Sequence, residues 1–150
     1  MNNKQENKQT AIEKVDELIE ETGKPLLRTK TIFPFKIFPT KIEIDKKMVN
    51  LIFYIFFFSK DTYPILIKDI KSVQVATNFL FGSLRIEVEG YEKNPAKINF
   101  LPKRQAEKVE YLVMGLKLLY NEKIDVSSID KDLLVKKAIK LGKAHSLTKK

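Results

Sequence analysis

The sequence contains no cysteine and no tryptophan, and its only histidine is His145 near the carboxyl end. A chain without cysteine has no disulfide framework, no thiol nucleophile and no thiolate metal ligand. A single imidazole without a second histidine or a thiolate lacks the partners that a zinc-type site needs. We therefore expect no metal site and no cofactor. The absence of cysteine also fits a reducing compartment, and we expect a cytoplasmic protein.

Long hydrophobic runs are absent as well. The longest apolar run, Leu51–Phe58, has eight residues, whereas a helix needs roughly 20 to span a bilayer. The first ten residues, MNNKQENKQT, lack the apolar core of a signal peptide. The run is therefore predicted to be a buried strand. Because side chains alternate along a strand, both of its faces are apolar and each needs a cover.

Patterns typical of catalysis are missing. The five glycines are scattered and form no phosphate-binding loop. Glu87 and Glu89 share one face of an alternating segment, which predicts a solvated strand face rather than a catalytic carboxylate pair. Asp125, Asp130 and Asp132 lack the glycine and the spacing of a calcium loop. We therefore expect that the chain is not an enzyme.

The net charge of +9 is concentrated at the carboxyl end. Residues 1–30 carry six basic and six acidic groups, residues 31–130 carry fifteen and twelve, and residues 131–150 carry seven and one. The basic excess is therefore mainly a property of the tail. Its lysines come without arginine or interleaved aromatic residues, so nucleic acid is not the expected partner.

Hydrophobic periodicity divides the chain into parts at residues 1–29, 30–121 and 122–150. The first part combines a polar terminus with an amphipathic helix over about 11–22. The last part is a linker followed by a basic amphipathic helix over about 130–143, with Gly142 near its end. Between them, Pro102 is well placed to start a helix over about 103–121, where apolar residues recur at 3.6-residue spacing.

The middle part is predicted to be mainly β. It opens with an extended, proline-punctuated apolar segment, 31–38, and a kink is expected near 68–70. A loop or hairpin corner is expected at Phe79–Ser83, where Gly82 is free to adopt positive φ. Short strands separated by turn signals are typical of an antiparallel arrangement; they are predicted at 41–45, 48–58, 63–75, 84–89 and 97–101.

This order of elements resembles the pleckstrin-homology-like (PH-like) fold, and more narrowly the bacterial PH-like domains. The resemblance covers roughly residues 30–121. It is carried by Pro39–Asp45, by Tyr63–Val73 with its Ile67-x-x-Ile70-x-x-Val73 spacing, by Phe81–Ile86, and by the helix containing Ala106. It implies an α+β, mainly β fold: an antiparallel β-sandwich or partly open barrel closed by one amphipathic helix, with added N- and C-terminal helices. The similarity is one of hydrophobic spacing and speaks for the fold rather than for a ligand.

Excess apolar surface leads to the first functional hypothesis, a non-catalytic PH-like binding or assembly module. Its partner would be another protein or a second copy of the chain. The interface candidates are one face of the long strand, a loop, and a second stripe on the 103–121 helix: Ile52, Tyr54, Phe56, Phe58, Phe79, Leu80, Phe81, Tyr111, Met114 and Leu118. Two alternatives stay open, because the loop residues could fold back to plug the barrel end and the terminal helices could cover the other faces.

The basic helix leads to the alternative hypothesis, peripheral association with an anionic membrane at the inner membrane face. Such a helix could lie in the interface with its lysines toward acidic headgroups. An ordinary amphipathic helix packed on the domain is the competing interpretation. The candidate residues for contact with an anionic surface are Lys136, Lys137, Lys140, Lys143, Lys46 and Lys47.

Overall fold

The computed structural model describes residues 9–17, 19, 23–56, 58–90 and 96–148. Within them the chain forms two antiparallel sheets followed by helices, which confirms the α+β class. The first sheet has the strand order β1 (Leu27–Lys30), β2 (Thr40–Ile44), β3 (Met48–Phe56), β4 (Ser59–Leu66). The second has the order β5 (Ile70–Thr77), β6 (Phe81–Val88), β7 (Ala96–Pro102). Among the described strands no pairing joins the two sheets, so they do not form a closed barrel.

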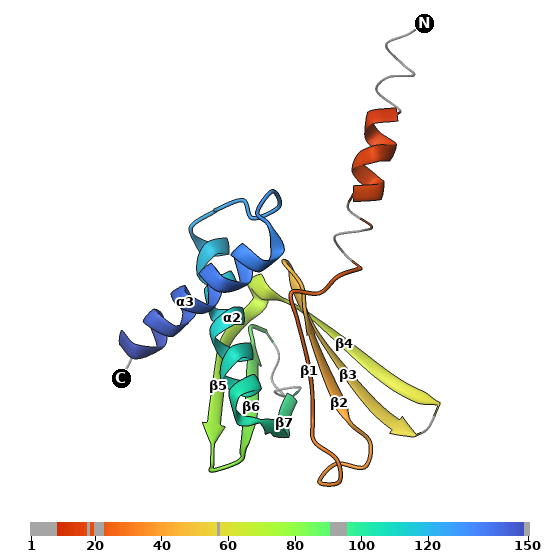
Figure 1. Cartoon of the computed structure of the whole chain (residues 1–150), viewed down its shortest axis with the longest axis vertical. Coiled ribbons are helices and arrows are strands. Elements are labelled where there is room, and N and C mark those ends of the chain that lie inside the picture. The colour runs from red at the N-terminus through yellow and green to blue at the C-terminus, as the bar shows by residue number, and fades with distance from the viewer. Residues whose placement is uncertain (1–8, 18, 20–22, 57, 91–95, 149–150) are drawn as a thin grey trace, which may run out of the picture.

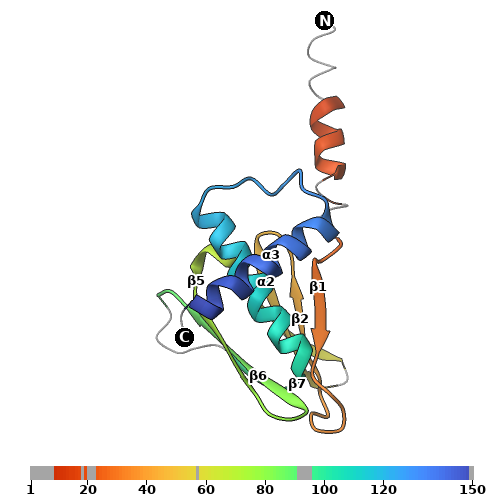
Figure 2. The ribbon, with the colours of Figure 1, turned by 60° about the vertical axis from the view of Figure 1, so that its left-hand side comes forward.

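The two sheets are connected at the expected kink. A single 3-10 turn, η1 (Ile67–Asp69), separates β4 from β5 and carries the chain from one sheet to the other. Helix α2 (Lys103–Asn121) then packs on the second sheet, and α3 (Lys131–Thr148) crosses α2 (Figure 1; Figure 2). The sequence-based bounds of α2 are confirmed. Residues 9–17 and 19 are helical, and the rest of the expected 11–22 helix lies outside the described residues.

One continuous core joins both sheets and both helices. In the first sheet, Ile42 and Ile44 of β2 lie opposite Leu51 and Val49 of β3, and all four side chains are fully buried. They meet buried residues of β5–β7 and α2, and α3 adds Leu134 and Ala138. The alternation of β2 and β6 therefore has the expected cause, which is one buried face on each strand.

The long apolar run is shorter as a strand than expected. It ends at Phe56, and a bulge between Tyr54 and Phe56 makes Ile55 the extra residue against β4. A bulge changes which side chains share a face. The prediction that Ile52, Tyr54, Phe56 and Phe58 continue one strand face is therefore wrong beyond Tyr54.

The segment expected to be extended at 31–38 is instead an irregular loop between β1 and β2. It contains a cis peptide bond between Phe33 and Pro34. The base of the loop is closed by the buried residues Thr31 and Thr40, because the Thr40 N–H donates to Thr31 Oγ1 (3.0 Å) and the Thr31 N–H donates to the Thr40 carbonyl (3.0 Å). These two hydrogen bonds between buried residues fix the two ends of the loop to each other.

Glycine is needed at positions 82 and 142 for reasons other than those expected from the sequence. Gly82 lies inside β6 and is not among the residues with positive φ; an added Cβ would lie 2.6 Å from the Cβ of Ala106, so glycine is needed for the close approach of α2. Gly142 does not end α3, which continues to Thr148. It is buried against the backbone of Tyr111, where a Cβ would overlap with the carbonyl oxygen.

Candidate functional site

Three hairpin connections, β1–β2, β3–β4 and β5–β6, lie at the same end of the molecule. In Figure 1 they lie on the lower side, spread from the β5–β6 tip at the left to the β3–β4 tip at the right, whereas the link between α2 and α3 lies at the upper end (Figure 1; Figure 2). The strands run antiparallel, so alternate connections return to the same side. Connections that are far apart in the chain therefore lie at one end of the fold.

Each of these connections exposes apolar side chains. Phe33 on β1–β2 is 75% exposed, Phe58 on β3–β4 is 101% exposed and Phe79 on β5–β6 is 92% exposed. Ile37, Phe56 and Leu80 beside them are also largely exposed. Exposed apolar groups that cluster in this way mark interaction surfaces more often than scattered ones do.

Aromatic rings connect the tips to one another. The Phe35 ring lies 4.8 Å from the Phe81 ring and 5.7 Å from the Phe100 ring, and the Phe38 ring stacks on Phe56 at 5.9 Å between centroids. The β1–β2 loop therefore bridges the two sheets at this end. We call this surface the aromatic end; it comprises Phe33, Phe35, Ile37, Phe38, Phe56, Phe58, Phe79, Leu80, Phe81 and Phe100.

The backbone at Phe100 has a strained conformation, and the Phe100 ring belongs to the aromatic end. Its φ is 62°, and the β6–β7 register shifts next to it, between Gly82 and Leu84. A left-handed conformation at a non-glycine residue costs of order 1–3 kcal/mol and is retained where surrounding structure imposes it. Here it accompanies contact of the Phe100 ring with Phe35 and Phe81, and the Phe100 carbonyl also accepts the N–H of Ile32 at 2.9 Å.

Basic groups surround the aromatic end. Residues 31–39, 55–60, 77–82 and 100–104 contain four basic side chains and no acidic one. Lys60, Lys103 and Arg104 are exposed. Lys36 is half-buried: its ammonium donates to Thr40 Oγ1 at 2.6 Å and lies 5.7 Å from the centroid of the Phe53 ring, and burial lowers the pKa of Lys36.

The amino end of α2 adds to the positive potential here. Pro102 precedes the helix without a side-chain cap, and the first turn contains no acidic residue. The N–H of Lys103 donates to the Leu80 carbonyl at 3.3 Å, which ties this turn to the β5–β6 tip. Because a helix amino end carries a positive partial charge, the basic residues Lys103 and Arg104 are placed where they are electrostatically unfavourable for the fold.

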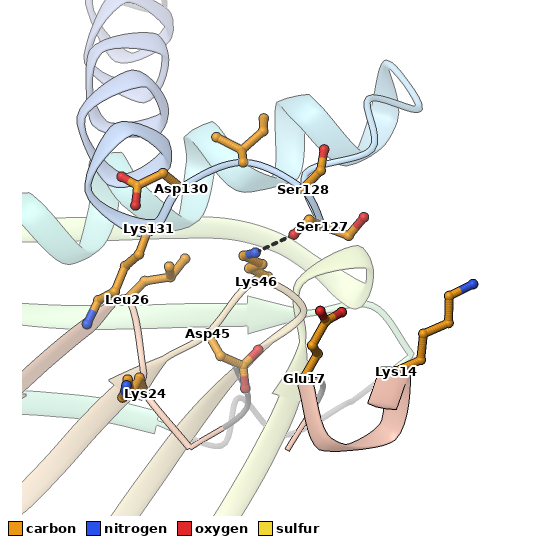
Figure 3. A pocket seen from close by; sticks show the side chains of 11 residues that line it. Lys14, Glu17, Lys24, Leu26, Asp45, Lys46, Ser127, Ser128, Asp130 and Lys131 are labelled. Carbon is orange, nitrogen blue, oxygen red and sulfur yellow. Dashed lines mark hydrogen bonds between the residues drawn. The ribbon is translucent and has the colours of Figure 1, made fainter. Parts of the chain in front are cut away.

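A separate hollow of about 750 Å³ is lined by Lys14, Glu17, Lys24 and Leu26, by the β2–β3 turn and by the linker before α3 (Figure 3). Its charges are mixed. Asp45 accepts the N–H groups of Lys47 and Met48, and Asp130 caps α3 by accepting those of Asp132 and Leu133. These carboxylates therefore have structural roles. The described part of the chain contains no group of three or more residues suited to hold a metal ion.

The sequence-predicted interface residues fall into three places. Phe56, Phe58 and the Phe79–Phe81 loop belong to the aromatic end. Phe81 packs against Phe35 and Phe100, whereas Phe79 and Leu80 project into solvent.

The remaining interface candidates lie elsewhere and are half-buried. Ile52 and Tyr54 lie on the outer face of the first sheet, where the Lys41 ammonium covers the Tyr54 ring at 5.0 Å and donates to its hydroxyl at 2.9 Å. Tyr111, Met114 and Leu118 belong to α2, which α3 crosses at Tyr111. Burial, followed by the nearby Glu110 and Glu107 carboxylates, raises the pKa of Tyr111.

The predicted anionic-surface lysines are also separated. Lys136, Lys137, Lys140 and Lys143 are exposed on α3. The apolar side of that helix is packed, since Leu134 and Ala138 are buried in the core. At the β2–β3 turn, Lys47 is exposed, whereas the Lys46 ammonium donates to the Ser127 carbonyl at 2.7 Å across the hollow (Figure 3).

The sequence-based prediction did not include five residues of the aromatic end as interface candidates. Four of them had been assigned to an extended segment (Phe33, Phe35, Ile37 and Phe38), and Phe100 had been assigned to a strand. The signal that could have identified the first four is the density of proline, with Pro34 and Pro39 in one short segment. Proline removes a backbone donor and disfavours a strand interior, so apolar residues between prolines are candidates for an exposed loop.

No family model matches the chain, and no curated protein or solved structure matches it either. Within the described residues, no helix is both long and apolar enough to cross a bilayer.

Proposed function

We propose that this chain is a non-catalytic binding module of PH-like architecture, and that the aromatic end is its binding surface. The observation that carries the proposal is the exposure of apolar side chains on three hairpin connections at one end of the molecule. A folded domain gains nothing in stability from an exposed phenylalanine, because no apolar area is removed from water. Exposed apolar side chains that cluster in this way mark surfaces where a partner removes that area from water.

The PH-like part of the proposal is supported by the arrangement of elements. Four antiparallel strands are followed by three, and an amphipathic helix then packs on the second group. The Ile67-x-x-Ile70-x-x-Val73 spacing begins in the turn between the sheets and continues into β5, and all three side chains are buried. Its hydrophobic spacing thus coincides with the point where the chain changes sheets.

The non-catalytic part is supported by the contacts of the candidate acids. Glu87 accepts a hydrogen bond from the Ser72 hydroxyl at 2.8 Å across β5 and β6, and Glu89 is exposed. Asp45 and Asp130 accept backbone N–H groups. These contacts give Glu87, Asp45 and Asp130 structural roles in strand pairing, in the β2–β3 turn and at the start of α3.

The proposal predicts that the tips can be changed without loss of stability. We expect the combined variant Phe33→Ser, Phe58→Ser and Phe79→Ser to unfold in urea within about 0.5 kcal/mol per site of the unchanged chain, since surface substitutions are usually that small. Leu51→Ala, on the buried face of β3, is the control and should cost about 2–5 kcal/mol. A loss of several kcal/mol in the Ser variant would show that the tips serve folding, and would refute the proposal.

The same variant tests whether a second copy of the chain is the partner. If a second copy is the partner, light scattering at high micromolar concentration should show a dimer for the unchanged chain and a monomer for the Ser variant. A clean monomer in both cases would count against self-assembly and leave another class of partner.

A further inference from the structure

We propose that the partner of the aromatic end is an anionic lipid bilayer, which the three hairpin tips enter together. This inference rests on the proposed function, because it uses the same surface. Phe33, Phe58 and Phe79 are the side chains that enter the interfacial region. The basic side chains around them contact the headgroups.

The shape of the surface favours a bilayer. The most exposed phenylalanines lie on three separate connections rather than in one groove (Figure 1). A protein partner would need three matching depressions at fixed spacing, whereas the interfacial region of a bilayer adapts to convex tips. Apolar side chains that penetrate only as far as the acyl boundary gain affinity in proportion to the apolar area they bury.

The charge of the surface also favours an anionic bilayer. Lys60, Lys103 and Arg104 are exposed in the segments that form this end, and residues 31–39, 55–60, 77–82 and 100–104 contain no acid. The uncapped amino end of α2 adds a positive partial charge. A symmetric dimer through the same surface would place these cations against their own copies, which is unfavourable. Acidic headgroups provide the opposite charge.

The basic helix α3 is a weaker candidate for the same partner. Its lysines are exposed, but Leu134, Ala138 and Gly142 of its other side are buried. An interfacial helix needs its apolar face in the lipid. In this fold that face is engaged with α2, so α3 contributes charge but no inserting side chain.

The absence of cysteine permits a direct test by site-specific labelling. Single variants Phe33→Cys, Phe58→Cys and Phe79→Cys are each labelled with a nitrobenzoxadiazole fluorophore. Glu122→Cys, an exposed position after α2 and far from the tips, is the matched control. The labelled chains are mixed with vesicles of equal parts phosphatidylglycerol and phosphatidylcholine.

We expect blue-shifted, brighter emission from all three tip labels and an unchanged spectrum from the Glu122→Cys label. Quenchers placed in the acyl region should reduce emission only at the tips. If the tip labels do not respond, or if the control responds equally, the insertion model is wrong.

Variants measure the contribution of each part by vesicle co-sedimentation. The Phe33→Ser, Phe58→Ser, Phe79→Ser chain should lose at least about tenfold in partition coefficient, the loss expected from removing apolar burial. Replacement of Lys136, Lys137, Lys140 and Lys143 by Gln should cost less than about threefold, since these residues lie away from the tips. Phosphatidylcholine vesicles alone should bind more weakly than the mixed vesicles.

The contrary results are equally specific. If the Gln variant loses binding and the Ser variant does not, the basic helix is the contact and the present inference is wrong. If the unchanged chain binds neither vesicle while the Ser variant keeps full stability, the bilayer is excluded but a binding surface remains. If the Ser variant is unstable, the proposed function itself fails.

Discussion

At the scale of single residues, two glycines determine how closely α2 and α3 approach. Gly115 of α2 faces the backbone of Ala138, and Gly142 of α3 faces the backbone of Tyr111. Tyr111 and Gly115 are one turn apart in α2, and Ala138 and Gly142 are one turn apart in α3. Because Gly115 faces Ala138 while Tyr111 faces Gly142, the two helices cross in antiparallel directions with their backbones in contact. A methyl group at either glycine would overlap with a carbonyl group.

This contact predicts an unusual sign for a glycine-to-alanine substitution. Alanine at an exposed helical position normally stabilises by roughly 0.5–1 kcal/mol. Gly142→Ala should instead destabilise the chain by about 1–3 kcal/mol, because the added carbon overfills the crossing. Urea unfolding followed by circular dichroism measures the change.

Lys140→Ala is the matched control, because it lies on the exposed side of the same helix. We expect its unfolding free energy to stay within about 0.5 kcal/mol of the unchanged chain. A Gly142→Ala chain as stable as the control would mean that the two helices do not approach this closely.

At the scale of elements, α3 is an integral part of the core although it follows the two sheets and α2 in the chain. Leu134 is 1% exposed and Ala138 is fully buried. Asp130 caps the helix through its carboxylate, which accepts the N–H groups of Asp132 and Leu133. In addition, Lys117 of α2 donates to the carbonyls of Ile70 and Lys71, fixing α2 to the start of β5.

Neighbouring leucines of α3 provide a test of this docking. Leu134→Ala should cost about 2–5 kcal/mol of unfolding free energy, because it leaves a cavity against α2. Leu133→Ala removes the same atoms from a side chain that is 49% exposed, and should cost less than about 1 kcal/mol. Equal effects of the two substitutions on thermal unfolding would mean that α3 is not docked as described.

At the scale of the whole molecule, stability and binding make opposite demands on the amino end of α2. Basic residues there oppose the helix dipole, while an anionic partner needs them. Lys103→Glu should therefore stabilise the fold by about 0.3–1 kcal/mol. The same change should reduce binding to phosphatidylglycerol vesicles by roughly fivefold or more, since about 1 kcal/mol is attributed to each basic residue near an anionic surface.

Thermal unfolding and vesicle co-sedimentation on the same preparation measure the two effects. Lys71→Glu, an exposed lysine of β5 outside the aromatic end, controls for the change in net charge. A Lys103→Glu chain that binds anionic vesicles as well as the unchanged chain would exclude this end as the electrostatic contact.

Much of the fold could be predicted from local patterns, because these patterns record which side chains must leave water. The 3.6-residue spacing from Ala106 to Leu116 predicted α2, and the alternation at Ile42 and Ile44 predicted β2. Local patterns do not determine the structure where the same residues are compatible with two backbone conformations. A run such as Phe53–Phe58 continues as a strand or breaks at a bulge, and only its pairing with β4 decides which.

The candidate site was predicted only in part for the same reason. Phe56 and Phe58 were selected as part of one face of the long strand, and Phe79, Leu80 and Phe81 were selected as apolar residues of a loop. The prediction missed Phe33, Phe35, Ile37, Phe38 and Phe100, because an apolar residue in an exposed loop and one in a buried strand look alike in sequence. Their neighbours in space are distant in the chain, and Phe35 reaches Phe81 and Phe100 only after both sheets have formed.

The sequence by itself determined that this chain forms an α+β domain, without cysteine chemistry and with its basic excess near the carboxyl end. Periodicity and composition suffice for these features because they depend on each residue and its near neighbours. Tertiary structure alone decided that three distant connections form one aromatic end, that α3 packs through two glycines, and that its lysines lie apart from that end. These features depend on contacts between segments far apart in the chain, which local patterns do not encode.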